Sequence, residues 1–147
     1  MKVLIIASAL CGLALSALGA VGAHLMAPPD AAAASSATWH QPDASAWNSA
    51  MLYGFAHTLA ALLVVALPLQ RALARLAGWA FVLGTVLFSF AIMAKEILLA
   101  RFVPAGNPAE TMQLFDRITV VTPVGGIAFM IGWILLAAAS LMKRREA

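Results

Sequence analysis

Four long apolar stretches dominate the chain, and the central part of each is free of charged residues. They cover residues 3–25, 48–67, 76–98 and 120–142. A helix needs about 20 apolar residues to cross the roughly 30 Å of hydrocarbon in a bilayer. Each stretch meets this length, and all are too long for barrel strands. The pattern therefore predicts four transmembrane helices.

The composition favours lipid over a soluble core. Of the 147 residues, 63% are hydrophobic and 10% are charged, and the mean hydropathy is +0.94. Soluble domains carry about 45–50% apolar and about 25% charged residues. The sequence thus predicts an all-α membrane protein, a four-helix bundle forming one transmembrane domain over residues 1–147.

The connections between these stretches differ in character. Residues 26–47 form a loop rich in alanine, serine and proline, and residues 68–75 form a short basic turn. In the loop 99–119, Asn107, Pro108 and Glu110 have the spacing of a helix start. We expect a short helix there, lying on the membrane surface.

Positive charges are divided unequally between the two ends of the predicted bundle. One end carries Lys2, Arg71, Arg75, Lys143, Arg144 and Arg145; the other carries Lys95, Arg101 and Arg117 with every acidic residue except Glu146. Positive residues mark the cytoplasmic side, so both termini are expected in the cytoplasm. The alternative is a cleavable signal peptide, suggested by Lys2, the apolar run and the small residues around 18–20 and 21–23. This apolar run exceeds the usual signal core of about 7–15 residues.

His57 is the most informative polar residue, because it lies about 13 Å inside the second stretch at the helical rise per residue. Tyr53 lies one turn away on the same face. His57 is either a neutral histidine that bonds another helix or part of a proton relay, ligand site or cofactor site. His24 ends the first stretch, where it either caps the helix or pairs with His57 as a haem ligand.

Two further positions are candidates for polar contacts. Glu96 follows Lys95 where the third stretch leaves the membrane. It either stays at the interface beside Lys95 or turns inward toward His24 or Thr122. Thr122 precedes Pro123 at the start of the fourth stretch, a type of helix start that either binds an anion or packs closely on another helix.

Small residues recur at helical spacing on three stretches, and helices in lipid pack through such residues. These candidate packing residues are Ser8, Gly12, Ser16, Gly19, Ala20 and Ala23; Ala46, Ala50, Gly54 and Thr58; and Gly125, Gly126 and Gly132. They predict a compact bundle, with an oligomer surface as the alternative.

The motifs favour no enzyme class. The sequence lacks a metal-type Cys/His cluster, a nucleophile–base pair and a nucleotide-binding loop, so we expect no catalytic residues, metal or cofactor. The formal charge of +3 comes from short clusters that make no basic face for nucleic acid. We interpret the chain as a non-enzymatic membrane protein that acts through the bilayer, a second copy or another membrane protein. The alternatives are an oligomeric transporter or channel for small solutes or ions that uses His57, and a haem- or quinone-associated membrane subunit.

Four motifs in order resemble a known family. They are ALGAVGAH at residues 17–24, YGFAHTLA at 53–60, LGTVLFS at 83–89 and VTPVGG at 121–126, followed by Gly132-Trp133. They are similar to domain-of-unknown-function family 423, the YgdD-like and YwdK-like small bacterial inner-membrane proteins. The resemblance implies a four-helix inner-membrane protein of no established activity. The chain departs from the family pattern after Ser89, where Phe90-Ala91-Ile92 follows, and in a longer connection from Lys95 to Thr119.

Overall fold

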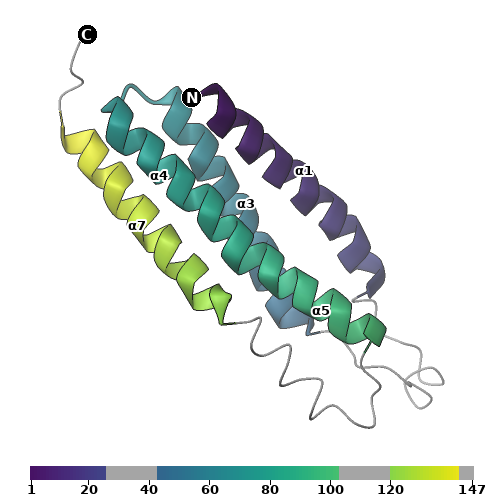
Figure 1. Ribbon diagram of the computed structural model, residues 1–147. Helices are drawn as coiled ribbons and strands as arrows, with labels where there is room; N and C mark the ends of the chain where they lie inside the picture. Colours follow the sequence, from purple (N-terminus) through teal and green to yellow (C-terminus); the bar gives the residue numbers. More distant parts are fainter. Residues whose placement is uncertain (26–42, 103–119, 143–147) are drawn as a thin grey trace.

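The computed structural model describes residues 1–25, 43–102 and 120–142. Its elements are α1 (Lys2–Leu25), α3 (Ala44–Ala66), α4 (Arg71–Gly84), the π-helix η1 (Thr85–Phe90), α5 (Ala91–Phe102) and α7 (Val121–Leu141). Elements α4, η1 and α5 follow one another in a single long rod (Figure 1). The described part therefore has four helices long and apolar enough to cross a membrane, which confirms the predicted fold class. The surface helix expected after Asn107 and most of both outer loops lie outside the described residues.

Local capping explains why two helices begin earlier than the apolar pattern indicated. The second helix begins at Ala44 rather than near residue 48, because the Asp43 side chain accepts hydrogen bonds from the backbone N–H groups of Ser45 and Ala46. The third begins at Arg71, because the Gln70 side chain accepts from the Leu73 N–H at 2.7 Å. The basic turn predicted over residues 68–75 is consequently shorter, and both of its arginines belong to α4.

The π-helix in the middle of the rod is a feature that the sequence pattern did not predict. A π-turn is wider than an α-turn and is often found at functional sites. Inside this segment the Thr85 hydroxyl donates to the Phe81 carbonyl at 3.0 Å, and both Thr85 and Ser89 are buried.

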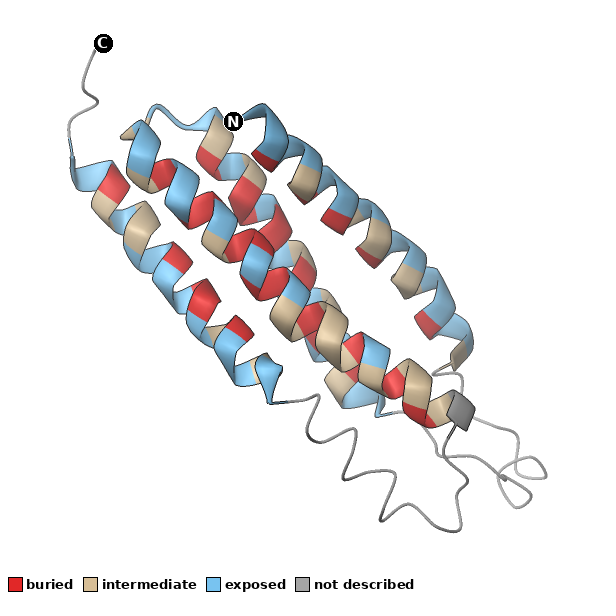
Figure 2. Cartoon of the chain, in the orientation of Figure 1, coloured by how far each residue is buried: buried red, intermediate tan, exposed pale blue. Residues whose placement is uncertain are grey.

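The rod is the centre of the bundle. Helices α3 and α7 both pack on α4 and η1, and α1 packs mainly on α3. In Figure 1, α1 and α7 lie on opposite sides of the rod, and Figure 2 shows the buried positions gathered along the rod and along the inner faces of its neighbours. Phe81 and Phe129 are part of one apolar core, and Leu15, Trp47, Ala50 and Met93 form a second.

The buried face of α1 differs from the predicted stripe of small residues. The structure buries Leu4, Ser8, Cys11, Leu15 and Gly22. Ser16 is exposed and its hydroxyl donates to the Gly12 carbonyl of its own helix. The stripe on α3 is closer to the prediction, since Ala50, Gly54 and Thr58 are all buried.

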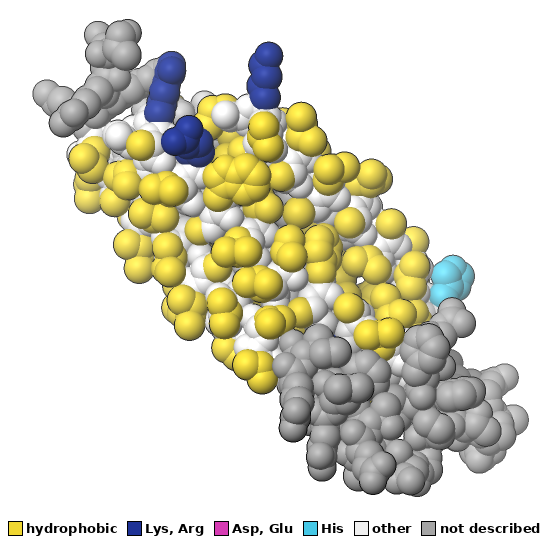
Figure 3. Space-filling model, viewed as in Figure 1, with side chains coloured by type: hydrophobic (Ala, Val, Ile, Leu, Met, Phe, Trp, Pro, Cys, Tyr) yellow, Lys and Arg dark blue, Asp and Glu magenta, His cyan; other side chains and the backbone are white. Residues whose placement is uncertain are grey.

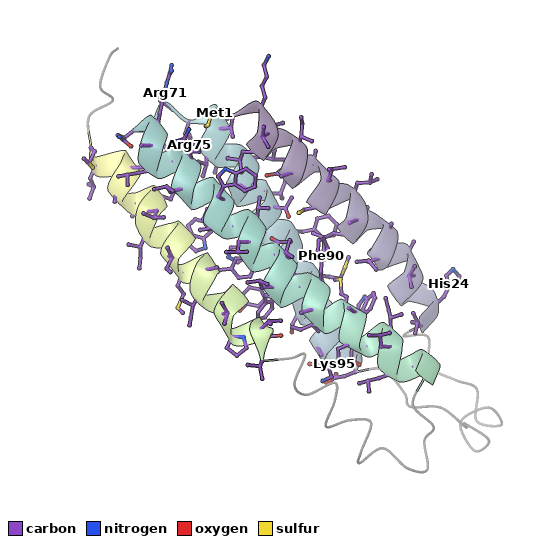
Figure 4. The ribbon with its side chains drawn as sticks, viewed as in Figure 1. Met1, His24, Arg71, Arg75, Phe90 and Lys95 are labelled. Atoms are coloured by element: carbon purple, nitrogen blue, oxygen red, sulfur yellow. The ribbon has the colours of Figure 1, made fainter. Side chains whose placement is uncertain are left out.

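Basic side chains gather at one end of the described bundle, in agreement with the sequence pattern. Met1, Arg71 and Arg75 lie at one end, which we call the Arg71 end, and Lys95 lies toward the other, the Lys95 end (Figure 4). Helix α1 begins and α7 ends at the Arg71 end (Figure 1). Between the ends, the visible face of the described residues carries mostly hydrophobic side chains and shows no Lys, Arg, Asp or Glu (Figure 3).

Candidate functional site

His57 lies in the middle of α3 and is only 6% exposed. Its Nε2 accepts a hydrogen bond from the indole Nε1–H of Trp133 on α7 at 3.1 Å, and its Nδ1 lies 2.8 Å from the Tyr53 carbonyl oxygen. An indole N–H only donates and a carbonyl only accepts. The imidazole therefore carries its proton on Nδ1 and is neutral, with both nitrogens in use.

Aromatic rings surround this histidine. The Phe129 ring stacks on it with the ring centroids 3.6 Å apart and the planes 14° apart. Phe81 and Trp133 contact it at steeper angles, with ring centroids 5.6 Å and 6.0 Å away. Tyr53 stacks at 5.9 Å, so the predicted proximity of Tyr53 and His57 is present. His57 joins α3 to α7 inside an aromatic cluster.

A groove follows the line between α3 and α7 on either side of the Trp133–His57 bond. Toward the Lys95 end it has a volume of about 430 Å³ and is lined by Tyr53, His57, Phe88, Pro123, Gly126, Ile127, Phe129, Met130 and Trp133. We call this part the α3–α7 groove. On the other side of Trp133 an apolar hollow of about 540 Å³ is lined by α3 residues between Ala56 and Ala66. Tyr53 and Trp133 are each about half exposed along this line.

Glu96 is buried and turns inward, but it binds neither His24 nor Thr122. Its Oε2 accepts from the backbone N–H of Asp43 at 2.8 Å, and its Oε1 lies 3.8 Å from the Lys95 Nζ. The carboxylate thus lies at the N-terminus of α3, where the helix dipole favours a negative charge. Glu96 ties α5 to the start of α3.

The remaining predicted site residues lie apart from His57. His24 is exposed and points away from the bundle (Figure 4). It therefore does not come together with His57 as a pair of haem ligands. The Thr122 hydroxyl is buried and makes no hydrogen bond within residues 1–25, 43–102 and 120–142. The structure brings together only Tyr53 and His57 of the five predicted residues.

Most of the predicted packing glycines meet another helix at very short range. A Cβ added at Gly125 would lie 2.5 Å from the Phe88 nitrogen, and one at Gly132 would lie 2.5 Å from the Phe81 ring. One at Gly54 would lie 2.8 Å from Leu15. At Gly19 the contact is Met51 at 2.9 Å, and at Gly12 it is Thr58 at the ordinary distance of 3.8 Å.

Gly126 differs from the other predicted packing glycines, because a Cβ added there would have no described atom within 4 Å. Gly126 borders the α3–α7 groove instead.

Sequence reasoning missed Trp133, Phe129 and Asp43 as partners of the predicted residues. The position of Trp133 could have marked it as a partner, because tryptophan prefers the membrane interface and Trp133 lies near the middle of a span. Its indole N–H must therefore find a hydrogen-bond partner inside the bundle. Asp43 is a typical N-cap residue just before an apolar run. Nothing in the sequence marked Phe129 as the ring that covers His57.

Comparison with known proteins places this architecture in a family. The family model described as "Protein of unknown function (DUF423)" matches residues 18–126, which include all of α3, α4, η1 and α5 and the first residues of α7. The chain belongs to the DUF423 family. No solved structure matches the chain.

The curated relatives are membrane proteins of similar length. UPF0382 inner membrane protein YgdD of Escherichia coli strain K12 is 29% identical over 99% of this chain and 94% of its own. UPF0382 membrane protein SERP0230 of Staphylococcus epidermidis is 28% identical over 96% of this chain and 97% of its own. A Staphylococcus haemolyticus relative, UPF0382 membrane protein SH2409, is 26% identical over 92% of the chain. This DUF423 protein is therefore a helical membrane protein whose relatives are named for location and not for activity.

Proposed function

We propose that this DUF423 protein is a non-catalytic protein of the bacterial inner membrane that acts through molecules bound to its lateral, lipid-facing surface. The observation that carries this proposal is that His57 and Glu96, the two buried ionisable side chains best placed for chemistry, are both used in bonds between helices. An interhelical hydrogen bond of this kind is an ordinary way to hold helices together in lipid.

We further propose that both termini lie in the cytoplasm. The gathering of Arg71 and Arg75 at the end where α1 begins and α7 ends supports this orientation. Reporter fusions after Asp43, after Gln70 and at the C-terminus test it. We expect the first reporter to be periplasmic and the other two cytoplasmic. Reporters after Asp43 and Gln70 on the same side would contradict the four-span arrangement.

The main competing function is a transporter or channel that uses His57. Proteoliposomes that contain the full-length protein and a pH-sensitive dye distinguish the two. We expect proton flux equal to that of empty liposomes of the same lipid, and the His57→Leu variant to change thermal stability alone. The matched control is Trp133→Phe, which breaks the same hydrogen bond but leaves the imidazole in place. Flux that His57→Leu abolishes and Trp133→Phe preserves would contradict a non-transporting bundle.

A further inference from the structure

The α3–α7 groove is open to the bilayer because α3 and α7 meet through side chains and not through closely packed backbones. Each helix packs on the central rod, and the Trp133–His57 hydrogen bond with the Phe129 stack joins them directly. Gly126 on the α7 wall leaves the space in front of it unfilled. The groove is thus already open in the structure as described.

The groove lies within the hydrocarbon layer. Arg75 and Lys95 are 20 residues apart on the same rod, which corresponds to about 30 Å and matches the thickness of the bilayer hydrocarbon. Phe88 precedes Lys95 by seven residues and so lies about 10 Å inside that boundary. The Tyr53 ring is 5.3 Å from the Phe88 ring, which places it at a similar depth.

The Tyr53 hydroxyl lies at this depth without a hydrogen-bond partner among the described residues. The side chain is 47% exposed, and none of the hydrogen bonds found among residues 1–25, 43–102 and 120–142 involves its hydroxyl. A hydroxyl without a partner in hydrocarbon is unfavourable. Phospholipids offer only methylene groups this far inside, because their ester and phosphate oxygens lie at the boundary. A ligand that carries an oxygen acceptor into the hydrocarbon would satisfy Tyr53.

We propose that the α3–α7 groove binds a lipid-soluble molecule with a flat, oxygen-bearing head group and an apolar tail, the chemical class of membrane quinones. The head lies beside Gly126, between Phe88 and Met130, and accepts a hydrogen bond from the Tyr53 hydroxyl. The volume of about 430 Å³ falls within the roughly 300–1,000 Å³ of small-molecule sites. The mainly aromatic and apolar lining, with one hydroxyl that has no partner among the described residues, also fits such sites.

This occupant fits the groove better than a helix from a second copy. A helix with its side chains is about 10 Å across. The groove walls are joined by a direct 3.1 Å hydrogen bond at Trp133, so a helix would lie over the groove and leave its floor empty. The apolar hollow on the far side of Trp133 provides a continuation for the tail. This inference rests on the proposed function, in which the protein acts through molecules bound to its lipid-facing surface. It adds no redox step to that function.

The test is a titration of the purified full-length protein in phospholipid nanodiscs with decylubiquinone, followed by tryptophan fluorescence quenching. We expect saturable quenching for the native protein. Gly126→Leu should weaken binding at least tenfold, since its side chain fills the open space. Tyr53→Phe should weaken it about fivefold to tenfold through loss of one hydrogen bond. Ala20→Leu, on the exposed face of α1, is the matched control and should bind normally.

Two further measurements make the result decisive. Decylbenzene has the ring and tail of the probe without oxygens and should bind at least fivefold more weakly than decylubiquinone. Equal binding of both probes, with no effect of Tyr53→Phe, would overturn the proposal in favour of a general apolar surface. A disulfide cross-link between two copies of a Met130→Cys variant, formed equally with and without decylubiquinone, would overturn it in favour of a dimer contact. If Gly126→Leu fails to fold, Met130→Phe narrows the same groove from an exposed position without adding a fluorescent tryptophan. Failure of binding would leave the topology and flux tests of the proposed function unaffected.

Discussion

Helix α7 meets its two neighbours in contrasting ways. Against α4 and η1 it packs so closely that Gly84, Gly125 and Gly132 leave no room for a Cβ. The Gly125 contact is with the Phe88 backbone, whereas Gly84 and Gly132 mainly meet the Phe129 and Phe81 rings. Against α3 it is held by side chains, through the Trp133–His57 hydrogen bond and the Phe129–His57 stack. The first contact is tight, and the second leaves the α3–α7 groove beside it.

The difference shows what holds helices together when lipid is the solvent. Apolar surface gains little by moving from lipid into a protein interior, so close van der Waals contact and hydrogen bonds must supply the stability. The glycine contact uses the first of these and the histidine contact uses the second. When long side chains join two helices across a gap, the rest of the gap stays open to lipid. A ligand site can arise in that gap.

The largest effect is expected from Gly125→Ala. Its new Cβ would lie 2.5 Å from the Phe88 nitrogen, and backbone cannot yield as a side chain can. We expect a loss of about 3 kcal/mol in the free energy of unfolding, at the upper end of overpacking effects. Unfolding in mixed detergent–SDS micelles measures it. The control is the neighbouring Gly126→Ala, which meets nothing and should be neutral or stabilising by about 0.5–1 kcal/mol. Equal losses at both positions would refute the contrast between the two contacts.

Glu96→Ala tests how the other wall of the groove is held. Helix α3 is fixed near its start by the Glu96–Asp43 hydrogen bond, so removing the carboxylate should let that wall loosen. We expect a loss of about 2 kcal/mol in the free energy of unfolding, the usual size for a hydrogen bond to a charged group. Hydrogen–deuterium exchange should rise in the first turns of α3 and not in α7.

Two controls separate the hydrogen bond from simple charge. Glu96→Gln keeps an acceptor for the Asp43 N–H and should lose about half as much. Lys95→Ala removes only the 3.8 Å ion pair with Glu96 and should cost about 1 kcal/mol or less. A larger effect of Lys95→Ala than of Glu96→Ala would show that the ion pair, and not the capping bond, fixes α3.

A double-mutant cycle on His57 and Trp133 measures the side-chain contact itself. The variants are His57→Leu, Trp133→Phe and their combination. We expect a coupling of about 1 kcal/mol, within the range of interhelical hydrogen bonds in membranes. Additive losses would mean that the hydrogen bond contributes nothing and that ring packing alone joins α3 to α7.

The number and type of helices were predictable, because length and hydropathy report directly on a bilayer crossing. The buried faces were predictable only in part. On α3, Gly54 and Thr58 are buried as their spacing indicated, whereas on α1 the large side chains of Leu4 and Leu15 are buried and Ser16 is exposed. Lipid and protein interior are both apolar, so the hydrophobic pattern does not distinguish the two faces of a helix.

The site was less predictable than the fold. Tyr53 and His57 lie one turn apart on one helix, and their proximity follows from helix geometry alone. The bond to Trp133 depends on how α3 and α7 are aligned, which no pattern within either helix determines. The width of η1 also changes which residues of the rod face the groove, and that π-turn has no sequence signature comparable to a cap.

The smallest expected effect on stability is that of Tyr53→Phe. This variant separates residues that hold the helices together from residues that only line the α3–α7 groove. The hydroxyl has no hydrogen-bond partner within the described residues, while the ring stacks on His57 and meets the Phe88 ring at a tilt of 57°. Removing the hydroxyl alone should therefore change the free energy of unfolding by less than about 0.5 kcal/mol in ligand-free nanodiscs. Thermal unfolding followed by tryptophan fluorescence checks this. A loss above 1 kcal/mol without ligand would place the hydroxyl in the helix contacts, whereas a loss seen only with decylubiquinone present would place it in the groove.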